Sequence, residues 1–168
     1  MKTTIKLYSL ACNDIRAYLF TLLFVAGNLL LPRLCHMVAD GGLMLLPVYF
    51  FTLVAAYKYG LQVGLLTGAL SPLVNTLLFG MPAAAMLPLI LIKSCLLAGC
   101  AAYAARRSGK VAFVAVLLAV VAYQAVGFAV EGAWVGFEAA RRALQVSAPG
   151  ILLQIFGGYA LLKVTEKL

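Results

Sequence analysis

One basic side chain lies deep inside an apolar stretch of this sequence, and it has the clearest chemical meaning. Lys93 stands ten residues after Ala83, the first residue of an apolar run, or roughly 15 Å along a helix. An ionisable side chain in such a helix is costly, and it is kept where it meets a counter-charge or a functional partner. Glu131, at the end of the following apolar run, is the candidate counter-charge. Two interpretations stay open: a structural ion pair with Glu131, and a contact with an anionic ligand.

Polar residues recur at helical spacing in three other apolar runs. Residues three, four or seven apart share one face of a helix. A mostly apolar pocket with a few convergent polar groups would show this pattern, and so would hydrogen bonds that only join helices. The residues are Thr67, Ser71 and Asn75 at intervals of four, then Gln124 with Glu131 and Ser147 with Gln154 at intervals of seven.

Residues for catalysis or metal binding are sparse. The cysteines at 12, 35, 95 and 100 form no CxxC pair, and His36 is the only histidine. A zinc site or a histidine-based triad needs more such ligands and bases than this. No nucleophile and base, and no paired carboxylates, stand at a useful spacing. The sequence therefore predicts no enzyme, no cofactor and no metal.

The surrounding elements are those of a membrane protein. Of the 168 residues, 65% are apolar and 11% charged, and the mean hydropathy is +1.06. A soluble domain could not cover that much apolar surface, whereas lipid accepts it. We expect an all-α integral membrane protein with one transmembrane domain over 1–168. Its six predicted helices are roughly 17–31, 43–57, 61–79, 83–105, 111–130 and 146–162, against a spanning length of about 20 residues.

Basic residues are distributed unequally between the connections. With the N-terminus inside, nine of the 13 basic residues fall on the cytoplasmic side and three on the outer side, and Lys93 lies within the fourth helix. Cytoplasmic loops of membrane proteins collect Lys and Arg. Both termini are therefore predicted to be cytoplasmic, in a multi-pass protein of a bacterial cytoplasmic membrane. The basic residues form no continuous stripe, so the net charge of +8 does not indicate nucleic-acid binding.

The connection 131–145 is long enough to hold structure of its own. It contains the only tryptophan, Trp134, which with Phe137 suits a lipid–water interface. Glu138 precedes Arg141 and Arg142 by three and four residues. This spacing predicts a short surface helix with internal ion pairs.

Small residues repeat along the third predicted helix. Gly60, Gly64 and Gly68 follow a GxxxGxxxG spacing, which lets another helix approach closely. The neighbour is either another helix of this chain or a partner subunit.

The segment 60–90 carries a family resemblance. It reads GLQVGLLTGALSPLVNTLLFGMPAAAMLPLI and resembles the substrate-binding membrane subunits, called S components, of energy-coupling-factor (ECF) vitamin transporters. The resemblance rests on the three glycines, the Ser71–Pro72 step, Asn75 and the Gly80–Met81–Pro82 turn. Weaker similarity includes Pro149, Gly150 and Gln154 near the start of the last helix.

The resemblance implies a transport function. Such a subunit captures a vitamin or vitamin precursor from outside and delivers it inward with a membrane coupling protein and two ATPase subunits. Ligand contacts in the family come from the first outer loop and from helices four to six. With the polar stripes, this gives six candidate substrate-binding residues: Lys93, Asn75, Gln124, Glu131, Gln154 and Trp134.

The resemblance also implies a docking surface and a type of cargo. Docking in the family uses small residues of the early helices, often an alanine-x-x-x-alanine pattern; here Ala17 is followed by Thr21, a departure from it. The candidate docking residues are Ala17, Thr21, Gly60, Gly64 and Gly68. Relatives with this turn often carry an acidic residue near the position of Lys93, so the reversed charge suggests an anionic cargo of the lipoate, biotin, pantothenate or nicotinate kind. The alternative is a membrane scaffold protein of the MreD type, which transports nothing.

Overall fold

The fold was analysed in a computed structural model that describes residues 10, 13–35 and 47–165. Within these ranges the chain forms helices and no strands. Four segments are long and apolar enough to cross a membrane: Leu61–Phe79, Ala84–Ser108, Phe113–Val135 and Ala148–Thr165. Ile15–Leu31 is a shorter apolar helix. This is the make-up of an α-helical, multi-pass membrane protein.

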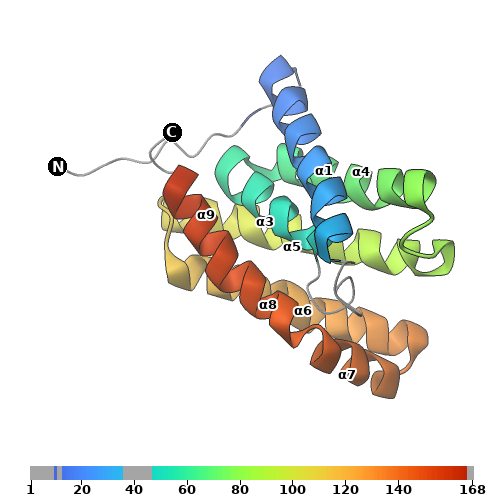
Figure 1. The fold of residues 1–168 in the computed structure, drawn as a ribbon. Coiled ribbons are helices and arrows are strands. Elements are labelled where there is room, and N and C mark those ends of the chain that lie inside the picture. Colours follow the sequence, from blue (N-terminus) through green and yellow to red (C-terminus); the bar gives the residue numbers. More distant parts are fainter. Residues whose placement is uncertain (1–9, 11–12, 36–46, 166–168) are drawn as a thin grey trace.

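Figure 1 shows the helices packed into one bundle, with α8 and α9 running back along α6 toward α3. Each of the six predicted apolar segments holds helix, although 43–46 and His36 lie outside the described residues. The elements are α1 (Ile15–Cys35), α3 (Pro47–Tyr59), α4 (Leu61–Phe79), a 3₁₀ turn (Ala84–Met86), α5 (Leu87–Ser108), α6 (Phe113–Val135), α7 (Phe137–Val146), α8 (Ala148–Leu152), a π-helical turn (Leu153–Gly157) and α9 (Gly158–Thr165).

Glycines set the ends of the middle helices. Gly80 follows α4 with φ of 67°, and its N–H donates to the carbonyl of Thr76. Gly109 ends α5 in the same way, with φ of 62°. Only glycine adopts this left-handed conformation without strain, and it is the usual residue just past a helix C-terminus. These two stops fix the lengths of α4 and α5.

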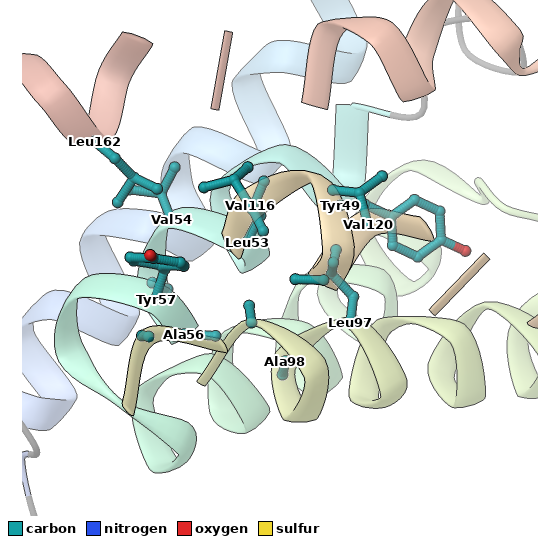
Figure 2. Close-up of a cluster of buried hydrophobic side chains, with 14 of the residues drawn as sticks. Tyr49, Leu53, Val54, Ala56, Tyr57, Leu97, Ala98, Val116, Val120 and Leu162 are labelled. Carbon is teal, nitrogen blue, oxygen red and sulfur yellow. The ribbon is translucent and has the colours of Figure 1, made fainter. Parts of the chain in front are cut away.

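The short helix α3 lies at the centre of the molecule. Every residue from Thr52 to Lys58 is buried, because α1, α4, α5 and α9 all pack on this helix. In Figure 2 the side chains of α3, among them Leu53 and Tyr57, meet those of α5, α6 and α9. A helix that is apolar on every side belongs inside a bundle. Neighbouring helices therefore shield α3.

The outward faces of the surrounding helices are apolar. Leu22 of α1 is 68% exposed and Leu77 of α4 is 83% exposed. Large apolar side chains at such exposure suit contact with lipid rather than with water.

A separate amphipathic helix, α7, follows α6. Arg141 donates to Glu138 at 3.1 Å, which confirms the predicted surface helix and one of its ion pairs. Trp134 is 60% exposed and Phe137 62% exposed. Both side chains are thus free to meet a lipid–water interface, where aromatic residues gather.

Candidate functional site

An ion pair joins α5 and α6 inside the helices. The Lys93 ammonium contacts the Glu131 carboxylate, and these side chains are only 17% and 8% exposed. The aliphatic stem of Lys93 lies against Gly127, where an added Cβ would stand 3.1 Å from the Lys93 Cγ and Cε atoms. Gly127 therefore makes room for Lys93 to reach Glu131. Of the two interpretations of Lys93, the pairing with Glu131 is confirmed, and ligand contact stays a prediction.

A polar stripe on α6 extends from this pair. Tyr123, Gly127 and Glu131 are spaced four apart and are all buried, so they share one helix face. The Tyr123 hydroxyl donates to Gln154 Oε1 at 2.8 Å. The ring of Tyr49, on α3, lies 6.0 Å from that of Tyr123. We call Tyr49, Lys93, Tyr123, Glu131 and Gln154 the ion-pair site.

Gln154 occupies an irregular part of the last membrane segment. It belongs to the π-helical turn Leu153–Gly157 and is completely buried. Its Oε1 accepts from Tyr123, but its Nε2 has no hydrogen-bond partner. π-Helical turns inside α-helices are often found at functional sites. A buried amide donor without a partner is rare and needs an explanation, such as a bound molecule that accepts from it.

The ion-pair site gathers several kinds of polar group inside the helices. It holds a cation, a carboxylate, two phenols and an amide in apolar surroundings, the mixture that orients a small polar ligand. Lys93 can pair with an incoming carboxylate, while Gln154 Nε2 can donate to a second acceptor. In the described part of the chain, no three His, Cys, Asp or Glu side chains are grouped as metal ligands.

A second group of buried polar side chains joins α1, α3 and α4. Asn28 Nδ2 donates to Ser71 Oγ at 2.9 Å and to Thr52 Oγ1 at 3.3 Å. Asn28 Oδ1 accepts from the backbone N–H of Phe51 at 3.3 Å. We call Asn28, Thr52 and Ser71 the amide cluster. It connects three helices through one fully buried side chain.

The predicted substrate-binding residues divide between these regions. Lys93, Glu131 and Gln154 belong to the ion-pair site, and half-buried Gln124 is next to Tyr123 on α6. Asn75 is buried on the face of α4 that carries Ser71, on the side of the amide cluster. Trp134 is exposed near the end of α6.

Four residues of these regions were not predicted. They lie inside apolar runs and are Asn28, Tyr49, Thr52 and Tyr123. The spacing of Tyr123 to Gly127 and Glu131, four and eight residues, was a usable signal. Asn28 stands seven residues after Thr21 on the same helix, but its hydrogen-bond partners come from α3 and α4.

The predicted docking residues lie largely inside the chain. Ala17 and Thr21 are buried, and Thr21 Oγ1 donates to the Ala17 carbonyl at 2.7 Å. A Cβ on Gly64 would stand 2.4 Å from the Ala56 Cβ, and one on Gly68 2.8 Å from Ser94 Oγ. Gly64 and Gly68 thus serve helix packing within this chain. Gly60 caps α4 with φ of 97°. A docking role for these five residues stays a prediction.

Comparison with known proteins adds no relative to this picture. No family model matches the chain, and no curated protein or solved structure gives a significant match.

Proposed function

We propose that this chain is the substrate-binding subunit of an ECF-type importer, which captures a small anionic vitamin or vitamin precursor and delivers it inward. The observation that carries the proposal is the ion-pair site. A buried ion pair lies on one stripe with a buried tyrosine, and that tyrosine bonds to an amide with an unpaired Nε2. Ionisable residues inside membrane helices are rare, and they mark substrate pathways and ligand counter-ions.

The topology proposed with this function has six membrane crossings, of which α1 and α3 are the first two. Both termini are then in the cytoplasm of a bacterial cell, and the ion-pair site lies toward the outer side. Supporting this topology are the distribution of basic residues and the shielding of α3, which lets a 13-residue helix sit inside a membrane bundle.

The partners proposed are a membrane coupling protein and two ATPase subunits. Copurification of the tagged full-length chain from its host in mild detergent, with mass spectrometry of the bound proteins, tests them. We expect one polytopic membrane protein and two ATPases. Cell-wall synthesis proteins without an ATPase, under conditions that keep a known importer intact, would favour the MreD-type scaffold instead.

The charge of the cargo is tested separately. Thermal unfolding of the purified protein is measured with lipoate, biotin, pantothenate and nicotinate, each paired with its uncharged amide. We expect one acid to raise the midpoint and its amide to have a much smaller effect, because the amide offers no charge to Lys93. Stabilisation by an amide equal to that by its acid would contradict the anionic cargo.

The two tests fail independently of each other. Copurified ATPases with an uncharged cargo would keep the transport proposal and remove the role of Lys93 in selecting an anion. A bound acid without any ATPase would leave a binding protein that is not part of an importer.

A further inference from the structure

A groove lies between α1, α3 and α9, apart from the ion-pair site. It encloses about 650 Å³, and none of its lining residues belongs to the ion-pair site or the amide cluster. Both α1 and α9 pack on α3, which forms the floor, and Figure 1 shows these two helices on either side of it. The lining is almost entirely apolar, with Lys58 and Thr165 as its polar members.

The length of the groove matches one leaflet of a bilayer. Its α1 wall runs from Phe20 to Leu30, or roughly 15 Å along the helix. The hydrocarbon core of a bilayer is about 30 Å thick, so each leaflet contributes about half of that. Phe20 stacks on Tyr59 with ring centroids 4.0 Å apart, and Gly27 admits the ring of Phe51. The groove is therefore preformed and can hold an extended apolar chain.

A cation stands at one end of this groove. Lys58 is in the last turn of α3, two residues before the glycine that begins the membrane segment α4, and so at the membrane boundary. Its ammonium donates to the backbone carbonyl of Thr165, which uses one of three protons. Among the described residues, no carboxylate lies within ion-pair distance of Lys58. Within residues 10, 13–35 and 47–165, the Lys58 ammonium therefore has no acidic partner beside the apolar groove.

From this geometry we propose that the groove binds an anionic phospholipid, with its phosphate at Lys58 and one acyl chain along α1. The Lys58 cation at the membrane boundary matches the anionic headgroup of such a lipid. The apolar groove, about one leaflet long, matches its acyl chain. A basic residue near an anionic membrane surface contributes about 1 kcal/mol. A zwitterionic phospholipid fills the groove equally well but gains less at Lys58, so the site selects for net negative charge.

Native mass spectrometry of the full chain, released from detergent after incubation with phosphatidylglycerol or phosphatidylcholine, tests the proposal. We expect phosphatidylglycerol to be retained about fivefold better, the ratio that corresponds to such a contact. Lys58→Gln should remove this preference, whereas Lys58→Arg should keep it. Arg107→Gln removes an exposed charge in the last turn of α5 and serves as the matched control.

The groove is tested with two neighbouring leucines of α1. Leu23 lines the groove, while Leu22 does not, and both are largely exposed. Leu23→Trp should lower retention of both lipids, and Leu22→Trp should leave it unchanged. Equal retention of the two lipids by the unaltered chain, or an unchanged preference in Lys58→Gln, would overturn the proposal. If Lys58→Gln does not fold, two other results test the proposal. They are the retention of phosphatidylglycerol relative to phosphatidylcholine by the unaltered chain, and the difference between Leu23→Trp and Leu22→Trp.

Discussion

The amide cluster and the ion-pair site are both buried and polar, yet they differ in how fully their hydrogen-bonding groups are used. In the amide cluster, Asn28 donates twice and accepts once, all to groups of this chain. In the ion-pair site, Gln154 keeps a buried Nε2 without a partner, and the charges of Lys93 and Glu131 face each other across two helices.

Under the proposed function, this difference separates a structural cluster from a binding site. Opening the amide cluster would break the three hydrogen bonds of Asn28, each worth about 0.6 kcal/mol on average between membrane helices. A ligand that enters the ion-pair site gains an unused donor and can replace one charge partner by another. Only the second arrangement has spare capacity for an incoming molecule.

The largest expected effect comes from breaking the ion pair from one side. Lys93→Met or Glu131→Leu alone leaves an uncompensated buried charge, which costs about 3–5 kcal/mol. The double substitution should regain most of that stability, because two apolar side chains then face each other. Unfolding of the single and double variants in detergent measures this coupling.

Ligand binding by the same double variant decides what the pair is for. If Lys93 holds the cargo, the double variant is stable and does not bind it. If the double variant is stable and still binds the cargo with the affinity of the unaltered chain, the ion pair is only structural. It then does not differ in role from the amide cluster.

Much of the fold could be predicted because lipid imposes a simple rule on sequence. The local signals are long apolar runs, glycines at helix C-termini and the spacing of Glu138 to Arg141. The helices of the structure lie at the positions that these signals indicate. The residues 61–79 coincide with α4.

The site was predicted less completely, because its assembly depends on contacts between helices. Lys93 and Glu131 were paired from charge alone, since no other carboxylate lay within the apolar runs. The place of Gln154 depends on a π-helical turn that shifts the face of the helix, and nothing in the spacing from Ser147 reveals such a turn. Asn75 shares a polar spacing with Thr67 and Ser71, but that spacing does not say which neighbouring helix the stripe faces.

An intermediate effect is expected from a glycine that holds α4 on α3. In Gly64→Ala the new Cβ would stand 2.4 Å from the Ala56 Cβ and 2.7 Å from its Cα, so the helices must separate, at a cost of about 1–3 kcal/mol. Gly99→Ala on α5 meets open space and should be neutral or stabilise by up to about 1 kcal/mol.

Cargo binding by the Gly64 variant sharpens the comparison further. Separation of α3 from α4 strains the amide cluster, whereas the ion pair connects α5 with α6. We therefore expect lower stability with little change in cargo affinity once the protein is folded. A large loss of affinity in folded Gly64→Ala, absent in Gly99→Ala, would show that the two regions are coupled.

The smallest of these effects is expected at the amide cluster itself. Asn28→Leu keeps a similar volume and removes the two donated bonds and the bond accepted from Phe51. Hydrogen bonds between membrane helices contribute about 0.6 kcal/mol on average and about 1.7 kcal/mol at most, so the loss of three bonds is expected to cost about 1–2 kcal/mol in detergent unfolding. Cargo affinity should not change, because the cluster has no unused donor on Asn28. If Asn28→Leu keeps its stability but no longer binds cargo, the amide cluster is part of the binding site. The distinction between a structural cluster and a binding site would then be wrong.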